Sequence, residues 1–336
     1  MSPPAAATRR RVPVAWLARF AISALVLLVL FYWIPVGDVW AQAQRLAPAV
    51  WVGALLVFLA GHAAAAAKWR LLIGHGVSFT HAFQAHLGGL AANLCLPGLA
   101  SGDVVRAGLV FNEAQDRSRL VIGSIADRLL DMLGLLIFAA LGAVLVWRPE
   151  YAQHGMFTWF LAASVIGVLA LLAAFALLSR LANRLVQPMS GTRGIRGAIV
   201  RAIGVAAALS HEPGRLLLCL GISMLVQATF IVINIVFATE LDVTAPWAAW
   251  FFAWSSAKIV AVAPVSLGGL GVREAALAQL LAPFGADPSQ VIAIGLVWQT
   301  VLYASGLLGA LALLVWKPAR APAGRVLAAD RAERAP

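Results

Sequence analysis

Apolar runs long enough to cross a membrane recur along the whole chain. A helix rises 1.5 Å per residue, so about 20 apolar residues cross the ~30 Å hydrocarbon core of a bilayer. Runs of this kind lie at 12–36, 48–72, 118–147, 156–179, 216–239 and 289–316. Because a segment in lipid has to satisfy its own backbone hydrogen bonds, each run predicts a helix. The sequence therefore predicts an all-α polytopic membrane protein with about six full transmembrane helices.

The composition excludes a soluble protein and a nucleic-acid-binding protein. Hydrophobic residues make up 62% of the 336-residue chain and charged residues only 12%, which is typical of an integral membrane protein. The net charge is +11, but no basic face is interleaved with aromatic residues, so no nucleic acid is expected as a partner. Cys95 and Cys219 lie in apolar sequence and are interpreted as buried hydrophobes. The histidines show no metal-ligand spacing, so neither a metal nor a cofactor is expected.

The basic residues predict the topology. Residues 12–316 are expected to form one integral membrane domain, between a basic tail at 1–11 and a disordered basic tail at 317–336. A basic loop is expected at 180–215. Because cytoplasmic loops are enriched in Lys and Arg, the two tails, this loop and the helix end at Lys68–Arg70 are assigned to the cytoplasm. The predicted location is a bacterial inner membrane, with several spans and both termini cytoplasmic.

The first apolar run has a second interpretation. A cleavable signal peptide is the alternative for 12–36, since Ala41-Gln-Ala43 resembles a cleavage site. The run is long for the apolar part of a signal peptide, which favours an uncleaved first helix.

Two stretches, 93–110 and 263–274, interrupt apolar sequence with residues that break helices. The breaks are Pro97, Gly98 and Gly102 in the first, and Pro264, Gly268, Gly269 and Gly271 in the second. Given the sides assigned above, each stretch has to leave one face of the membrane and return to it. This predicts two re-entrant broken-helix hairpins that enter from opposite faces, as in an inverted repeat of about 12–148 and 156–316. If each hairpin arm crosses fully instead, the chain has eight or more spans and its ends keep the same sides.

Arg106 and Arg273 are the first candidates for substrate binding. Each follows a Gly-containing break and opens a helix, where free N–H groups and the helix dipole favour an anion. A guanidinium there offers two hydrogen bonds to a phosphate. The alternative is that Arg106 pairs with Asp103, and Arg273 with Glu274, only to neutralise charge. The full set of candidate substrate-binding residues is Arg106, Arg273, Asn93, Asp103, Ser101, Ser266, Lys258 and Glu274; for Asn93, Ser101 and Ser266, helix capping is the alternative.

Asp127, Arg128 and Asp131 are candidates for coupling or gating. The two aspartates are four residues apart and share a helix face, roughly 15 Å into an apolar run. Charged residues at such depth often mark ion or proton paths. The alternative is an ion-pair lock against Arg106 or Lys258, and Arg128 is also spaced to pair with Asp131. Lys258 itself has the same two interpretations, ligand or lock.

The motifs resemble a known family when taken together. They are Asn93 with Leu96-Pro97-Gly98, Gly102-Asp103 with Arg106, Asp127-Arg128 with Asp131, and the stretch from Pro264 to Glu274. In combination they are similar to the membrane region of lysylphosphatidylglycerol synthases, also called the flippase-like integral membrane family, over about residues 12–316. In well-known members this region is held to move an aminoacylated phospholipid between leaflets, and a separate soluble domain transfers the aminoacyl group. The resemblance therefore implies lipid handling by a stand-alone member without that soluble domain.

These observations predict a lipid-binding membrane protein rather than an enzyme. It is expected to flip an amphipathic, anionic phospholipid or lipid-linked headgroup between leaflets. No nucleotide-binding motif is seen, so movement is expected to be downhill or ion-coupled. Expected partners are a membrane lipid and a separate lipid-modifying enzyme. Two alternatives stay open: an intramembrane transferase acting on a lipid-linked substrate, and a non-transporting scaffold for a lipid-modifying enzyme.

Overall fold

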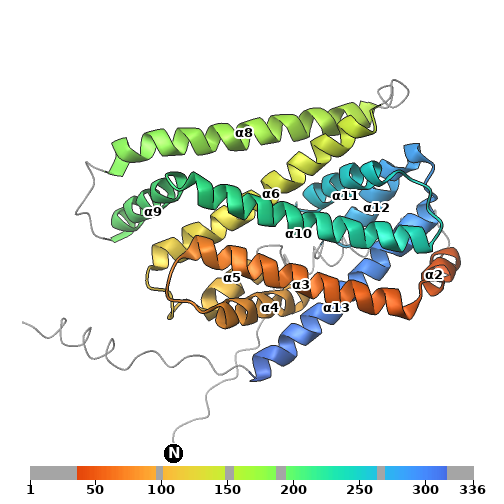
Figure 1. Cartoon of the computed structure of the whole chain (residues 1–336), viewed down its shortest axis with the longest axis horizontal. Coiled ribbons are helices and arrows are strands. Elements are labelled where there is room, and N and C mark those ends of the chain that lie inside the picture. The colour runs from red at the N-terminus through yellow and green to blue at the C-terminus, as the bar shows by residue number, and fades with distance from the viewer. Residues whose placement is uncertain (1–35, 96–100, 148–154, 187–193, 263–268, 316–336) are drawn as a thin grey trace, which may run out of the picture.

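The computed structural model describes residues 36–95, 101–147, 155–186, 194–262 and 269–315, and every regular element within these ranges is helical (Figure 1). The helices are α2 (Val36–Gln44), α3 (Pro48–Ile73), α4 (Phe79–Cys95), α5 (Ser101–Leu109), α6 (Arg117–Leu145), α8 (Gly155–Val186), α9 (Gly194–Ser210), α10 (Pro213–Glu240), α11 (Trp247–Ala261), α12 (Val272–Leu281), the 3₁₀ turn η2 (Ala282–Phe284) and α13 (Pro288–Val315).

Five of these helices are long and apolar enough to cross a membrane. They are α3, α6, α8, α10 and α13, with the apolar part of α8 at Phe157–Leu177. They correspond to five of the six predicted spans. The sixth, 12–36, lies outside the described residues except for Val36, which begins α2. The prediction of a polytopic α-helical membrane protein is thus confirmed, whereas the number of six spans is not tested.

The basic segment at 180–215 is largely helical instead of forming the expected loop. Helix α8 continues to Val186, α9 covers Gly194–Ser210, and α10 begins at Pro213. The physical reason is that the segment is rich in Ala and Arg, which both have high helix propensity. Basic charge marks a segment as polar, but it does not break a helix.

Local signals set the ends of the long helices. Pro48 opens α3, which ends before Gly74, a residue with φ of 86°. The Asp116 carboxylate caps α6 by accepting hydrogen bonds from two backbone N–H groups of its first turn. Asp287 caps α13 in the same way and also accepts a hydrogen bond from the Ser289 hydroxyl. This hydroxyl lowers the pKa of Asp287, because it stabilises the ionised carboxylate.

Two pairs of short helices occupy the stretches predicted to be broken. Helix α4 has 17 residues and packs against α5 with 9, while α11 has 15 residues and packs against α12 with 10. The connections at 96–100 and 263–268 lie outside the described residues. The predicted breaks at Pro97, Gly98, Pro264 and Gly268, and the candidate Ser266, fall in these two connections.

The described glycines of the breaks have separate structural roles. Gly102 lies where α5 meets α4, and a Cβ added there would stand 2.6 Å from the carbonyl oxygen of Gly89. Glycine is therefore required for this close approach. Gly269 and Gly271 have φ values of 80° and 82°, which other residues rarely adopt, and Gly271 directly precedes α12.

The same order of long and short helices occurs twice. The lengths of α3, α4, α5 and α6 are 26, 17, 9 and 29 residues, and those of α10, α11, α12 and α13 are 28, 15, 10 and 28. The two sets interlock, because α4 packs against α13 and α11 packs against α6. Glycines permit both crossings: a Cβ on Gly309 would stand 2.2 Å from the Leu87 carbonyl oxygen, and one on Gly142 would stand 2.5 Å from the Phe252 nitrogen.

An aromatic cluster joins the two sets at the core. Phe58 of α3 stacks on Phe230 of α10 with ring centroids 4.9 Å apart, and Trp298 of α13 lies 5.3 Å from Phe58. Trp254 of α11 completes the cluster at 5.1 Å from Trp298. Such contacts add stability beyond the burial of apolar area. The polar site described next lies beside this cluster.

Candidate functional site

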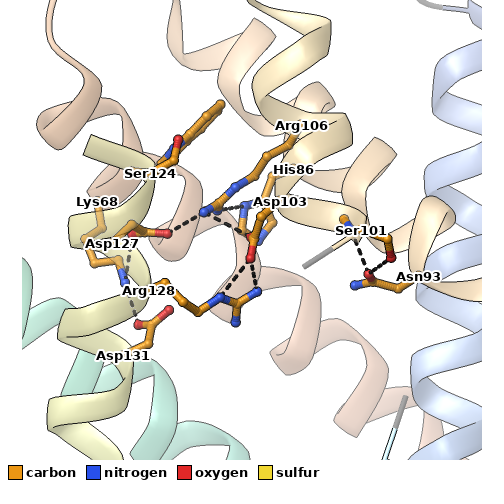
Figure 2. Close-up of polar contacts among 12 residues, drawn as sticks. Lys68, His86, Asn93, Ser101, Asp103, Arg106, Ser124, Asp127, Arg128 and Asp131 are labelled. Atoms are coloured by element: carbon orange, nitrogen blue, oxygen red, sulfur yellow. Dashed lines mark hydrogen bonds and ion pairs between the residues drawn. The ribbon is translucent and has the colours of Figure 1, made fainter. Parts of the chain in front are cut away.

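A cluster of charged side chains lies where α3, α5 and α6 meet (Figure 2). We call it the charge network. Its members are Lys68 of α3, Asp103 and Arg106 of α5, and Asp127, Arg128 and Asp131 of α6. Its three cations and three carboxylates balance one another. Balance is needed because an unpaired charge inside a membrane protein is strongly unfavourable.

Arg106 lies at the buried end of the network. It is 4% exposed. Its Nη2 donates to Asp127 Oδ2 at 2.7 Å and lies 3.2 Å from Asp103 Oδ1. The guanidinium also lies over the Trp69 ring, 4.7 Å from its centroid. The neutralising Arg106–Asp103 ion pair, which was the alternative interpretation, therefore forms in this conformation. Asp127 lies closer to the Arg106 guanidinium than Asp103 does.

Lys68 holds the two other carboxylates together. Its Nζ lies 2.9 Å from Asp127 Oδ1 and 2.5 Å from Asp131 Oδ1, and it donates to Ser223 Oγ of α10 at 2.7 Å. The contact with Asp127 is an ion pair without hydrogen-bond geometry, since Asp127 Oδ1 has no hydrogen-bond partner among the described residues.

Lys68 was assigned together with Arg70 to a cytoplasmic helix end, but its side chain lies inside the protein. Lys68 is 1% exposed and Trp69 is fully buried, while only Arg70 of the three is exposed. The physical reason is that the side chain of Lys68 turns inward to meet carboxylates of another helix, which the local sequence does not contain.

Arg128 forms the open edge of the network. Its Nε donates to Asp103 Oδ2 at 2.8 Å, and its Nη2 donates to the same oxygen. The Arg128 side chain is 47% exposed and that of Asp103 is 22% exposed. Arg128 thus pairs across to α5 instead of with Asp131 on its own helix, which was the spacing-based expectation. Asp131 is engaged by Lys68 and accepts a further hydrogen bond from Ser223.

Two partly buried histidines extend the network, and sequence reasoning missed both. Arg106 Nη1 lies 3.2 Å from His86 Nδ1, and His86 Nε2 lies 2.8 Å from His62 Nδ1. Because a guanidinium can only donate, His86 Nδ1 has to accept, so His86 carries its proton on Nε2 and donates to His62. Both imidazoles are then neutral. Their separation of 24 residues in the chain matches no motif, so no sequence signal could have found the pair.

Arg273 belongs to a second, separate cluster. Its Nε donates to Glu274 Oε1 at 3.0 Å, its Nη2 donates to the same oxygen, and Nη2 also donates to Gln299 Oε1 at 3.2 Å. Arg273 is 5% exposed and Glu274 is fully buried. The other oxygen of Glu274 accepts from the Gly271 N–H at 2.7 Å. The pair therefore neutralises itself and also caps α12.

Of the two cations named for an ion-pair lock with Asp127 and Asp131, Arg106 pairs with Asp127, whereas Lys258 pairs with neither. Asp131 is held by Lys68. Lys258 Nζ donates to Gln227 Oε1 at 2.8 Å and lies 5.4 Å from the centroid of Phe230.

Asn93 and Ser101 act as a helix cap in this conformation. Asn93 Oδ1 accepts from the Gly102 N–H at 3.0 Å and from the Ser101 hydroxyl at 3.2 Å. These bonds satisfy a donor at the start of α5. Among the described residues, no group of three or more His, Cys, Asp or Glu side chains is arranged to hold a metal ion.

Comparison with known proteins places this arrangement in a family. The model of the lysylphosphatidylglycerol synthase TM region matches residues 16–310, a range that includes both short hairpins and every member of the charge network. A comparison with curated proteins gave no match. Since the family model covers most of the chain, the protein belongs to the family of the lysylphosphatidylglycerol synthase transmembrane region.

Proposed function

We propose that this protein binds an amphipathic, anionic lipid and moves its headgroup between the two leaflets. The observation that carries the proposal is the charge network, whose Arg128–Asp103 pair is partly exposed while Arg106, Lys68 and Asp127 behind it are buried. Charged groups at membrane depth are costly and commonly mark the path of a polar substrate. Membership of a family of lipid-related membrane proteins supports the same substrate class.

The geometry supplies an exchange of ion-pair partners. A lipid phosphate that reaches Arg128 competes with Asp103, because both offer oxygens to the same guanidinium. Asp103 also contacts Arg106, so its displacement at the open edge removes one partner from the buried arginine. Arg106 then becomes available to the headgroup. In the set α10–α13, Arg273 becomes available to the headgroup in the same way when the headgroup displaces Glu274.

Asp127 and Asp131 supply coupling or gating in this scheme. Both share Lys68 as a cation. When one loses that contact, its charge has to be neutralised by a proton, a cation or the substrate. Movement of the headgroup is thereby linked to the state of the two carboxylates, without a nucleotide.

The two short hairpins are proposed to be re-entrant and related as an inverted repeat. Helices α5 and α12 have 9 and 10 residues, which at 1.5 Å per residue is about half of the ~30 Å core. Figure 1 supports the inversion: α3 and α10 run in opposite directions, and so do α6 and α13. The α4–α5 and α11–α12 hairpins lie near opposite ends of the molecule in the same view.

A location in the inner membrane with cytoplasmic termini completes the proposal. Buried Lys68 does not contribute to a basic surface. One basic, cytoplasmic side is supported by three other residues: exposed Arg70 at the end of α3, exposed Arg117 at the start of α6 and partly exposed Arg215 at the start of α10.

The test is leaflet redistribution of a fluorescent phosphatidylglycerol in proteoliposomes, followed by quenching of the outer leaflet. Wild type is expected to speed redistribution, and Arg106→Ala and Arg273→Ala are expected to abolish the gain. Arg215→Ala is the matched control, since it removes a cation paired with Glu212 outside the network. Protein-dependent redistribution that persists in both arginine variants would refute the proposed path. A wild type that binds the lipid without moving it would favour a transferase instead.

A further inference from the structure

Lys258 of α11 is a partly buried cation that lacks a carboxylate partner among the described residues. Together with it, the cations of the charge network and the Arg273 cluster are Lys68, Arg106, Arg128 and Arg273, and the carboxylates of these two clusters are Asp103, Asp127, Asp131 and Glu274. Four of these cations contact a carboxylate directly. Lys258 is the exception, and its described polar contact is the neutral amide oxygen of Gln227 at 2.8 Å. A lysine in an apolar surrounding with only a neutral acceptor is a site that favours an anion.

The surroundings of Lys258 reinforce that preference. Asp131, Arg128, Arg273 and Lys68 are among the charged groups that act on Lys258. His62 also lies within electrostatic reach, and it is a neutral ring in the arrangement described above. Because the charge network and the Arg273–Glu274 pair are each balanced, Lys258 carries the one excess positive charge among these groups, and an anion bound there would balance it.

Unused hydrogen-bond donors lie on the same helix face. Trp254 and Ser255 precede Lys258 by one turn of α11, a spacing that places them on its side of the helix. Both are buried, and Trp254 Nε1 and Ser255 Oγ have no hydrogen-bond partner among the described residues. Buried donors without partners are uncommon in folded proteins. A cation accompanied by free donors suits a ligand with several acceptor oxygens.

We infer that Lys258, with Gln227, Trp254 and Ser255 beside it, forms a binding site for a phosphate group. The inference rests on the proposed function and deepens it, by placing the headgroup phosphate between the two clusters during its passage. Lys258 is partly exposed, so a ligand can reach it. The same chemistry accepts the phosphodiester of an anionic phospholipid or a free phosphate ion.

The test measures binding by the purified full-length protein in nanodiscs of phosphatidylcholine. One arm adds phosphatidylglycerol and the other adds inorganic phosphate, with intrinsic tryptophan fluorescence and native mass spectrometry as readouts. Lys258→Met is expected to weaken phosphatidylglycerol binding by about tenfold or more, because it removes a charge-assisted hydrogen bond. Lys258→Arg is expected to stay within about threefold of wild type, because it keeps the charge. Arg215→Met is the matched control for loss of a cation elsewhere.

The arms separate the two sources of phosphate. Lys258-dependent binding of the lipid alone assigns the site to a headgroup, while Lys258-dependent binding of phosphate ion alone keeps the site and reassigns its ligand. Equal binding of both ligands by wild type and Lys258→Met overturns the inference. A measurement on unmodified protein guards against a misfolded variant: phosphatidylglycerol should protect Lys258 from a membrane-permeant amine reagent, and unchanged labelling of Lys258 would also overturn it.

Measurements on the same variants test the phosphate site and the proposed translocation separately. If wild type moves lipid and Lys258→Met binds and moves it equally well, the phosphate site is wrong and translocation stands. If binding depends on Lys258 but wild type moves no lipid, the site stands and translocation fails.

Discussion

Arg128 holds Asp103 through two donors, Nε and Nη2, and so ties the long helix α6 to the short helix α5. The pair is the most accessible part of the charge network, with 47% of the Arg128 side chain and 22% of the Asp103 side chain exposed. Because Asp103 also contacts Arg106, a change at this edge is transmitted to a buried cation. The pair is therefore the natural place to perturb lipid binding.

Asp103→Asn and Arg128→Ala are expected to change lipid affinity in opposite directions. Asp103→Asn removes the carboxylate that competes with a lipid phosphate for Arg128, so phosphatidylglycerol should bind several-fold more tightly. Arg128→Ala removes the donor and should weaken binding by about tenfold, the effect of one charge-assisted hydrogen bond. Equilibrium titration in nanodiscs measures both. Weaker binding in both variants would mean that the pair is only a structural clamp.

Lys68→Met is expected to be the most destabilising change in the network. It leaves Asp131 without a cation beside Asp127, which keeps only Arg106, and breaking a buried pair in this way typically costs about 3–5 kcal/mol. Unfolding in detergent, followed by circular dichroism, gives the free energy.

The control is the double variant Lys68→Met with Asp131→Asn, which also removes the carboxylate that Lys68→Met leaves without a cation. It should recover part of the loss, since the two changes act on one ion pair. Additive losses in the double variant would show that the contact between Lys68 and Asp131 contributes no coupling energy.

Gly309→Ala and Gly221→Ala form a matched pair of helix substitutions. A Cβ at Gly309 would meet the Leu87 carbonyl oxygen at 2.2 Å, whereas nothing lies within 4 Å of one at Gly221. Gly309→Ala should therefore force α13 away from α4 and destabilise the protein by about 1–3 kcal/mol. Gly221→Ala should be neutral or stabilising by up to about 1 kcal/mol, because alanine has the higher helix propensity. Equal thermal stability of the two variants would argue against the tight crossing.

His62 and His86 are each expected to show one tautomer. Arg106 donates to His86 Nδ1, and His86 in turn donates from Nε2 to His62. Nitrogen-15 NMR of histidine-labelled protein should therefore detect protons on Nε2 of both rings and none on Nδ1. In His86→Phe, the His62 signal should lose this hydrogen bond. A proton on Nδ1 of His86 in wild type would contradict the proposed direction of donation.

The sequence predicted those features that depend on local pattern. Five long helices follow from apolar length, and the two short hairpins follow from the Gly/Pro breaks. The Arg273–Glu274 pair was also within reach, because its partners are adjacent in the chain. The residues that determine each of these features lie close together in the chain, within one helical turn or one apolar segment.

The partners that lie far apart in the chain were not predictable in this way. Lys68 meets Asp131 across 63 residues and Ser223 across 155, and no local pattern encodes these distances. Arg128 has a carboxylate three residues away on its own helix, yet it pairs with Asp103, because the packing of α5 against α6 sets which partner is in reach. Rotation and packing of whole helices decide such contacts.

The reciprocal crossing of α4 with α13 and α11 with α6 has a consequence for biosynthesis. Ribosomes deliver a chain from its N-terminus, so α4 is made roughly two hundred residues before the helix on which it packs. The α4–α5 hairpin must therefore persist in the bilayer, with the surface around Leu87 that meets Gly309 still uncovered, until α13 is inserted. Helix α13 covers the α4–α5 hairpin. Truncation of the chain before α13 should therefore leave an assembly intermediate that quality-control proteases recognise.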